Sequence, residues 1–377
     1  MAVSAPSRLL IAAGGTGGHV YPGIAIAEEW MRLHRDSSVT FIGTERGVEA
    51  KAVPQAGFPF RAISARGFPR RPGIGMLVAA WAFVKSLGEV AAVIKEVKPD
   101  VVIATGGYVS GPTGIWAWLL GIPLVLQEQN SVPGAANRWL SLIASQVHIS
   151  FVESRNYFRR RNNLKVTGNP IRRSLLWQDR QGAYEALALD PARRTLLIFG
   201  GSRGAASINR AAAGALPILG HVPNLQVLWQ TGSDDYEAMR ELGSRLPMPA
   251  RVHPYLDQME RAYAVADLVV CRSGAMTITE LTACGLPAIL VPYPHAAGDH
   301  QTQNARGLVD RGAAEMIADR DLTPEELARR VEALFGDESR LRRLGRNARA
   351  FSRTNASERI VHSIEELAGA TAQDSES

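Results

Sequence analysis

Three glycine-rich segments of the chain have the composition of phosphate-binding loops. They are GGTGGHVYPG at 14–23, TGGYVSGP at 105–112 and GGSRGAASINR at 200–210, and each follows a short apolar run. Glycine lets an anion approach the backbone closely, and the N-terminus of a following helix favours negative charge. One such loop alone can be a simple strand-to-helix turn. Three of them at strand ends favour anion binding.

The first loop fits neither of the common nucleotide-binding motifs. A dinucleotide motif counted from Gly15 needs a glycine where the chain has Val20, and no Gly-Lys-Ser/Thr ends the loop. The sequence therefore does not favour a nicotinamide enzyme or a P-loop nucleotidase.

The segment CRSGAMTITELTACGLPAILVP at 271–292 predicts a strand end, a turn, a helix and the next strand. We expect Ser273 to cap this helix and the N–H groups of residues 275–277 to face a diphosphate. Glu280 lies one turn later. Its carboxylate could accept both hydroxyls of a ribose, or it could simply complement the helix dipole.

The elements that must position these groups alternate between strands and helices, which predicts an α/β fold with parallel strands and helical crossovers. Two series of strand-like runs are present: 8–13, 38–43, 100–105 and 124–129, then 195–200, 226–231, 268–273 and 287–293. Gly168 and Pro170 interrupt both periodicities between the series. We therefore predict two domains, 1–169 and 170–352, and expect a C-terminal helix at about 353–370 to pack back on the first.

Composition favours a globular protein. The 377 residues are 46% hydrophobic and 21% charged, and two cysteines are too few for a disulfide framework. The net charge of +6 favours anionic partners without selecting one, and no nucleic-acid-binding module is recognisable. The apolar run 116–126 is too short to span a bilayer, and no export signal is expected.

Seven motifs, in this order, resemble the MurG family: GGTGGHVYPG, ATGGYVSGP, QEQNSVPGAANR, VTGNPIR, GGSRGAASIN, RSGAMTITELTACGLPAILVPYPHA and DHQTQNA. The resemblance covers residues 8–365. It implies a GT-B fold, in which two Rossmann-like, doubly wound parallel-sheet domains face a cleft. It also implies an inverting transfer of GlcNAc from UDP-GlcNAc to the 4-hydroxyl of the muramoyl residue of lipid I, which makes lipid II for peptidoglycan.

The resemblance also implies the substrate-binding residues. Asn130 and Gln301 would bind sugar hydroxyls, with Gln303 as the alternative to Gln301, and the backbone of Leu256 would read uracil. The remaining donor contacts would be Thr16, Gly17, Gly18, Arg172, Ser202, Ala275, Met276, Thr277 and Glu280.

An inverting transfer needs a base for the acceptor hydroxyl and stabilisation of the leaving UDP. His19 is the leading candidate base, because an ordinary imidazole titrates near cytosolic pH. Orientation of the loop or of the acceptor is its alternative role. Glu128, at a predicted strand end, is the competing base.

We expect no cofactor and no obligatory metal. Asp319-Arg320-Asp321 has the spelling of a metal-binding Asp-x-Asp pair, but it precedes a predicted helix start at Thr323 in a polar stretch. We expect it to be a solvated turn.

The acceptor that the resemblance implies is carried by a membrane lipid. We therefore expect the protein at the cytoplasmic face of the cell membrane as a peripheral protein, with cell-wall and division proteins as candidate partners. Residues 65–85 combine basic and apolar side chains in a pattern that fits an anionic lipid surface. The alternative is that this helix packs in the core. The predicted membrane residues are Arg66, Phe68, Arg70, Arg71, Leu77 and Trp81.

Three other functions fit parts of this pattern. A glycolipid synthase of the same fold would share the donor site, and a UDP-GlcNAc epimerase would convert the donor without an acceptor. A sugar-nucleotide-binding scaffold of the division machinery would bind the donor without transfer.

Overall fold

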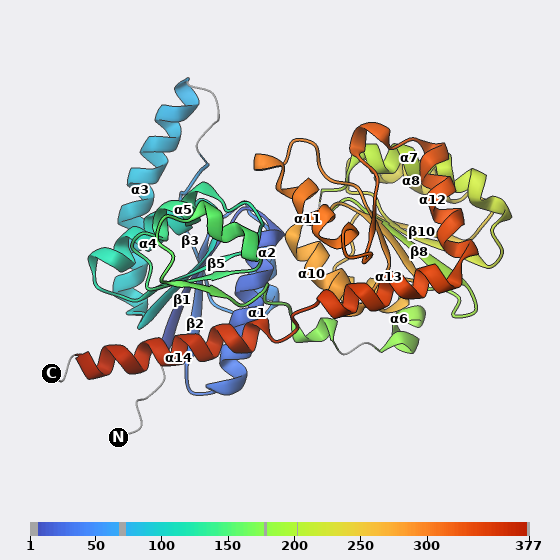
Figure 1. The fold of residues 1–377 in the computed structure, drawn as a ribbon. Coiled ribbons are helices and arrows are strands. Elements are labelled where there is room, and N and C mark those ends of the chain that lie inside the picture. Colours follow the sequence, from blue (N-terminus) through green and yellow to red (C-terminus); the bar gives the residue numbers. More distant parts are fainter. Residues whose placement is uncertain (1–6, 68–72, 177–178, 202, 375–377) are drawn as a thin grey trace. The chain divides into compact units, whose positions relative to one another are not determined.

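The computed structural model describes residues 7–67, 73–176, 179–201 and 203–374. The chain divides into two compact units (Figure 1). Unit 1 comprises Met1–Arg172 and Arg353–Ser377, and unit 2 comprises Arg173–Ser352. The expected linker residue Pro170 lies two positions before the end of the first segment of unit 1.

Unit 1 contains a seven-stranded parallel sheet in the order β3-β2-β1-β4-β5-β6-β7. Its strands are β1 (Arg8–Ala13), β2 (Ser38–Gly43), β3 (Phe60–Ala62), β4 (Val101–Gly106), β5 (Leu124–Glu128), β6 (Gln146–Ile149) and β7 (Leu164–Val166). Its α-helices are α1 (Gly17–Leu33), α2 (Glu49–Gln55), α3 (Ile74–Val97), α4 (Ser110–Leu119), α5 (Ala135–Leu140) and α14 (Ala356–Asp374).

The strands of unit 1 are nearly continuous apolar runs because helices cover both faces of the sheet. Two buried clusters lie on this sheet, one including Leu10 and Val102 and the other including Leu9 and Ile103. The C-terminal helix α14 belongs to the second cluster, and Figure 1 shows it alongside α1. Its apolar stripe includes Ile360, Val361 and Ile364, all buried.

Unit 2 contains a six-stranded parallel sheet in the order β10-β9-β8-β11-β12-β13. Its strands are β8 (Arg194–Phe199), β9 (Leu225–Gln230), β10 (Ala250–His253), β11 (Leu268–Cys271), β12 (Ala288–Leu290) and β13 (Glu315–Met316). Its α-helices are α6 (Arg180–Ala186), α7 (Ala206–Ile218), α8 (Tyr236–Gly243), α9 (Met259–Val265), α10 (Ala275–Cys284), α11 (His300–Val309), α12 (Pro324–Gly336) and α13 (Glu338–Phe351).

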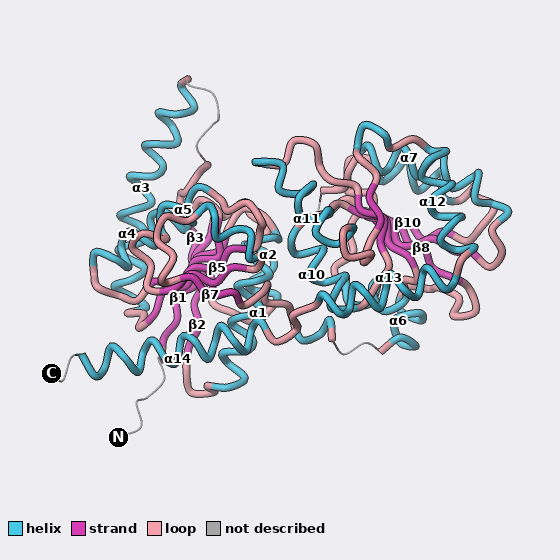
Figure 2. The backbone as a smooth tube through the Cα atoms, in the orientation of Figure 1, coloured by secondary structure: helices cyan, strands magenta, loops and turns pink. Residues whose placement is uncertain are grey.

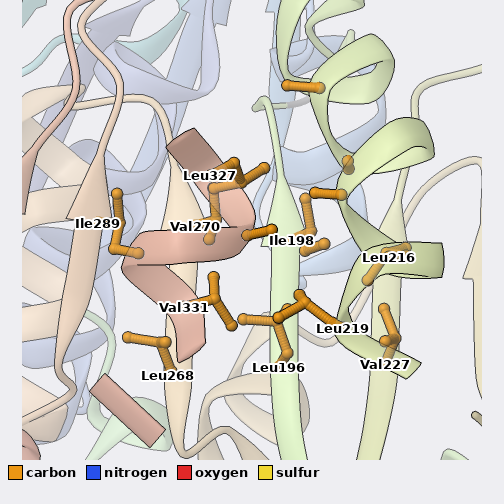
Figure 3. Close-up of a cluster of buried hydrophobic side chains, with 14 of the residues drawn as sticks. Leu196, Ile198, Leu216, Leu219, Val227, Leu268, Val270, Ile289, Leu327 and Val331 are labelled. Atoms are coloured by element: carbon orange, nitrogen blue, oxygen red, sulfur yellow. The ribbon is translucent and has the colours of Figure 1, made fainter. Parts of the chain in front are cut away.

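The core of unit 2 joins strand side chains to two helices (Figure 3). Ile198 and Val270 from the sheet pack with Leu216 of α7 and with Leu327 and Val331 of α12. The N-terminus of α12 is where the sequence predicts it, because the Thr323 side chain accepts a hydrogen bond from the N–H of Glu326.

The strands form two separate sheets, drawn in magenta in Figure 2. The predicted α/β fold with two parallel-sheet domains is therefore confirmed. In each sheet the strand order reverses at one point, between β1 and β4 in unit 1 and between β8 and β11 in unit 2. Open α/β sheets bind ligands at the carboxyl ends of the strands beside such a switch point.

Candidate active site

All four chemistry-bearing turns lie at the two switch points. In unit 1 the loops at 14–23 and 105–112 follow β1 and β4, the neighbouring strands at the reversal. In unit 2 the loop at 200–210 and the turn at 272–274 follow β8 and β11. Each unit therefore gathers its glycine-rich and polar turns at the carboxyl ends of the two central strands of its own sheet.

The buried carboxylate of Glu49 forms hydrogen bonds that hold the first glycine loop in place. Glu49 Oε2 accepts a hydrogen bond from the Gly15 N–H at 3.0 Å, and its Oε1 accepts from the Thr44 N–H at 2.9 Å. Thr16, the residue before α1, is exposed, and no acidic side chain occupies the first turn of this helix. Among the described residues, Glu49 is a loop-holding group that the sequence analysis missed.

The glycines of the second loop have a packing function. A Cβ on Gly107 would lie 2.2 Å from the carbonyl oxygen of Gly14, and one on Gly106 would lie 2.6 Å from His19 Nδ1. Both glycines also have positive φ. Side chains at these positions would separate the two loops, so close loop packing explains these glycines without any phosphate contact.

His19 lies between these loops with a defined environment. Its Nδ1 is 3.1 Å from the carbonyl oxygen of Thr105 and 3.1 Å from Gln129 Oε1. The ring is partly buried at the carboxyl edge of the unit 1 sheet. The role of His19 as a base stays a prediction.

Glu128 is enclosed by donors. It is 1% exposed, Oε1 accepts from the N–H and Nδ2 of Asn130, and Oε2 accepts from the Gly134 N–H and Asn137 Nδ2. These four contacts are 2.9–3.2 Å long. A buried carboxylate with every contact to the protein orients its loop, so this geometry favours an anchor for Asn130 over a proton acceptor.

Arg172 ends the first segment of unit 1 and stacks on an aromatic ring. Its guanidinium carbon lies 4.9 Å from the centre of the Tyr21 ring, on α1. This contact holds a positive group beside the helix that begins at the first glycine loop.

In unit 2 the third glycine loop is tied to the predicted uracil-reading segment by Gln230, which the sequence analysis missed. Gln230 Nε2 donates to the carbonyl of Gly201 at 2.8 Å, and its Oε1 accepts from the N–H of Leu256 at 3.2 Å. Gly204 in the same loop has φ +76, and a Cβ there would lie 1.9 Å from the carbonyl oxygen of Thr231. The predicted ligand Ser202 lies outside the described residues.

The turn before α10 differs from the prediction for Ser273. Gly274 is the residue that caps the helix, and the Ser273 hydroxyl donates to the carbonyl of Gln301 at 2.8 Å. The predicted Ser273 cap is wrong, because this hydroxyl instead holds the start of α11. Within the described residues, no side chain caps α10 and no acid lies in its first turn, so the N–H groups of Ala275, Met276 and Thr277 fit an anion.

Two polar side chains near α10 also have defined partners. The buried Tyr263 hydroxyl donates to Glu280 Oε2 at 3.0 Å, which orients this carboxylate. The Gln301 Oε1 atom accepts from the Tyr293 N–H at 2.9 Å, whereas Gln303 is exposed. The side chain of Gln301 is therefore held against the backbone of Tyr293.

The Asp-x-Asp segment forms a short 3-10 helix, η5 (Asp319–Asp321), instead of the predicted turn. Asp319 pairs with Arg272 and accepts a hydrogen bond from the Ser207 hydroxyl at 2.7 Å. The expectation of a solvated turn is wrong for Asp319, because its side chain is only 20% exposed and is paired with Arg272. The described residues contain no group of three or more His, Cys, Asp or Glu side chains that could hold a metal ion.

The predicted membrane segment is the exposed part of α3. Ile74, Leu77, Trp81 and Val84 are 66–82% exposed and recur at helical spacing, so they form one stripe. Arg66 is also exposed, whereas Phe68, Arg70 and Arg71 lie outside the described residues. Among the described helices, α3 is the one long and apolar enough to span a membrane by length and composition, which the search for uninterrupted apolar runs missed.

Two parallel α/β domains with glycine loops at their switch points form the architecture of GT-B glycosyltransferases. Residues 9–149 match the glycosyltransferase family 28 N-terminal domain, and residues 195–360 match the family 28 C-terminal domain. The chain belongs to the MurG family of these glycosyltransferases.

Individual relatives agree with this family. A Desulforamulus reducens protein named UDP-N-acetylglucosamine--N-acetylmuramyl-(pentapeptide) pyrophosphoryl-undecaprenol N-acetylglucosamine transferase is 40% identical over 366 residues, 96% of this chain and 98% of its own. The crystal structure of Acinetobacter baumannii MurG is 32% identical, covers 95% of this chain and 99% of its own, and has a TM-score of 0.72.

The fold of this chain is also similar to that of UDP-GlcNAc 2-epimerases. A UDP-GlcNAc 2-epimerase from Neisseria meningitidis has a TM-score of 0.70 over 94% of this chain and 98% of its own. Its sequence is only 13% identical. This likeness is one of fold alone.

Proposed function

We propose that this protein transfers GlcNAc from UDP-GlcNAc to the muramoyl 4-hydroxyl of lipid I, with inversion, and so forms lipid II. The observation that carries the proposal is the 40% identity to a transferase of this name over 96% of the chain. The placement of the motif residues at the switch points of both sheets supports it.

In the proposed reaction, His19 accepts the proton of the acceptor hydroxyl while that oxygen bonds to C1 of GlcNAc. The bond from C1 to UDP breaks, and its electron pair leaves with UDP. The N–H groups at the start of α10, together with Arg172 and Ser202, stabilise the charge on the leaving diphosphate. This stabilisation uses fixed dipoles and guanidinium charge, so we expect no obligatory metal.

The other donor contacts follow from the same assignment. Glu280, oriented by Tyr263, accepts the ribose hydroxyls, and the Leu256 backbone reads uracil. Asn130, anchored on Glu128, binds a GlcNAc hydroxyl, as does Gln301. Thr16, Gly17 and Gly18 contact the donor from unit 1.

We further propose that the protein binds the cytoplasmic face of the membrane as a peripheral protein, and the exposed half of α3 supports the membrane binding. Val90, Val93 and Ile94 lie in the core of unit 1, so the C-terminal half of this helix is packed in the protein. The exposed stripe from Ile74 to Val84 spans about 16 Å at 1.5 Å per residue, roughly half of a hydrocarbon core. Such a stripe fits insertion into one leaflet, beside the membrane-borne acceptor. Cell-wall and division proteins are candidate partners in the same compartment.

The test is a transfer assay that varies only the acceptor. Labelled UDP-GlcNAc is incubated with the full chain and with a lipid I analogue, with an acceptor lacking the muramoyl sugar, or with no acceptor. We expect label in the lipid fraction with the lipid I analogue alone. Label in the other lipid would indicate a glycolipid synthase, conversion of the donor sugar without acceptor would indicate an epimerase, and binding without any turnover would indicate a scaffold.

A further inference from the structure

The proton on the His19 ring can be assigned from its partners. The Nδ1 atom lies 3.1 Å from the backbone carbonyl oxygen of Thr105, and a carbonyl oxygen only accepts hydrogen bonds. The second neighbour of Nδ1, Gln129 Oε1, is also an acceptor at 3.1 Å. A neutral ring in this position therefore carries its proton on Nδ1 and leaves the lone pair of Nε2 available.

The orientation of the Gln129 amide is equally determined. Its Nε2 donates to the Thr105 carbonyl at 2.6 Å and faces two oxygens of Gln127, the backbone carbonyl at 3.3 Å and Oε1. Exchanging the Gln129 oxygen and nitrogen would place an oxygen against three oxygens. Its Oε1 must consequently be the atom that faces His19.

The side-chain amides of Gln127 and Asn169 hold Gln129 in this orientation. Gln127 Nε2 donates to Asn169 Oδ1 at 3.0 Å, and Asn169 Nδ2 donates to the backbone carbonyl of Gln129 at 3.2 Å. Gln127, Gln129 and Asn169 are all at most 3% exposed. These contacts form a series of hydrogen bonds that begins at the backbone carbonyl of Gln129 and ends at His19 Nδ1. Because a backbone carbonyl only accepts, each amide in the series fixes the orientation of the next one.

We infer that Gln129, supported by Gln127 and Asn169, is a positioning residue that holds His19 in the Nδ1–H tautomer and presents Nε2 as the proton acceptor. The role of Nε2 in transfer rests on the proposed function, whereas the tautomer is a property of the protein without substrate. The neutral amide matters for the chemistry. A carboxylate in its place would favour the imidazolium ion, which has no lone pair to accept the hydroxyl proton.

The first experiment reads the tautomer directly. The ¹⁵N spectrum of the histidine side chains is recorded for the full chain at pH 8, and the His19 signals are identified by their loss in His19→Gln. We expect a protonated Nδ1 and an unprotonated Nε2. A His19 ring protonated on Nε2 would overturn the inference, whatever the activity of the protein.

The second experiment changes Gln129. Gln129→Met keeps the size of the side chain and removes its polar atoms, so we expect a mixture of His19 tautomers. We also expect kcat to fall by about 10- to 100-fold, a part of the roughly 100- to 10,000-fold that a general base contributes, while KM for UDP-GlcNAc changes by less than about threefold. Gln129→Glu should move the acid limb of the pH–rate profile to higher pH by about one unit or more, with partial recovery of rate at high pH.

The matched control is Gln146→Met, which removes another buried glutamine of unit 1. Gln146 on β6 donates to the Ser363 carbonyl of α14 and does not contact His19 in the structure. This variant should lose stability but keep the His19 tautomer and the pH–rate profile of the natural protein. Gln129→Met with unchanged kcat, or Gln146→Met with the same kinetic change, would overturn the inference. Absence of transfer by the natural protein would instead contradict the proposed function and leave the tautomer result standing.

Discussion

Tyr263 donates its hydroxyl hydrogen to Glu280 Oε2 at 3.0 Å across the gap between α9 and α10. The phenol is fully buried, and burial, with the Glu280 carboxylate beside it, raises the pKa of Tyr263 well above its usual value. The phenol therefore remains a donor at all ordinary pH values, and it holds one oxygen of Glu280 in place.

Removing this contact should weaken donor binding. Tyr263→Phe loses one hydrogen bond to a charged group, about 1.5 kcal/mol, so we expect KM for UDP-GlcNAc to rise by about tenfold with little change in kcat. Titration calorimetry with UDP and steady-state kinetics would measure both effects. Tyr184→Phe, which removes another buried phenol of unit 2, is the control and should leave KM unchanged. Equal KM values for Tyr263→Phe and the natural protein would contradict the role of Glu280.

The glycine loop after β8 should not tolerate a side chain at Gly204. Gly204→Ala combines a positive φ with a Cβ 1.9 Å from the Thr231 carbonyl, so the loop must move. We expect a loss of about 2 kcal/mol or more in the free energy of unfolding, and at least tenfold weaker UDP binding. Gly57→Ala is the control, because its φ is +82 and no described atom lies within 4 Å of the new Cβ. If both variants bound UDP like the natural protein, the loop would not belong to the donor site.

The stability of unit 1 should depend on pH through His148. Burial, with the positive charges of Lys165 and Arg359, lowers the pKa of His148 to about 3. In the unfolded chain this histidine titrates near 6.5, so stability present above pH 6.5 is lost progressively as the pH falls toward 3. From pH 7 to pH 5 the free energy of unfolding should fall by about 2 kcal/mol because of this residue alone.

The measurement is urea unfolding of the natural protein and of His148→Gln between pH 7 and pH 5. The variant should show a smaller decrease with falling pH. His221→Gln is the control of opposite sign, since the hydrogen bond to Glu332 raises the pKa of His221. Its stabilisation is present at low pH and is lost as the pH rises. An unchanged pH dependence in His148→Gln would contradict the assignment.

Membrane binding should depend on the exposed stripe of α3. Leu77→Glu combined with Trp81→Glu places two charges on side chains that are 73% and 67% exposed, so folding should survive. We expect binding to vesicles of anionic phospholipid to weaken by about tenfold or more. Each apolar side chain that inserts into the membrane contributes about 1.5 kcal/mol or more to the binding free energy. Ile218→Glu, on an exposed apolar residue of unit 2, should bind like the natural protein.

Co-sedimentation with vesicles at low and high salt would measure this difference. Added salt should weaken binding of the natural protein, because basic groups such as Arg66 contribute through screened attraction. Equal sedimentation of the double variant and the natural protein would remove α3 from the membrane-binding surface.

Local patterns predicted the mostly apolar strands of the fold. The predicted runs starting at Arg8, Ser38 and Leu268 start β1, β2 and β11. The strands β3, β7, β10 and β13 were missed because they lie at the sheet edges, where they are only partly buried and show no continuous apolar run. The strand β6 was missed because Gln146 and His148 interrupt its apolar residues. Likewise, the sequence of α3 is almost uniformly apolar, so it did not indicate which half of the helix is exposed and which half is buried.

The sequence predicted the parts of the site that consist of backbone groups. It was less informative about side chains whose function is to hold other residues in place. The glycine loops and the α10 N-terminus lie at strand ends, as their spacing indicates. Glu128 was a candidate base from its residue type, but its partners are Asn130, Gly134 and Asn137, and such contacts are set by loop geometry. Gln230 was missed for the same reason, since its contacts to Gly201 and Leu256 are distant in sequence.

We propose that His19 removes the proton from a lipid-linked acceptor as GlcNAc arrives from UDP-GlcNAc. The most direct test is the single-turnover rate of labelled GlcNAc transfer to a lipid I analogue by the natural protein and by His19→Ala, at donor concentrations that saturate both. We predict a β-linked product, and a rate that falls by about 100-fold or more in His19→Ala while UDP-GlcNAc binding changes by less than about threefold. Equal rates for the two proteins would contradict the role of His19 as the base, and label that never enters the lipid fraction would contradict the transfer reaction itself.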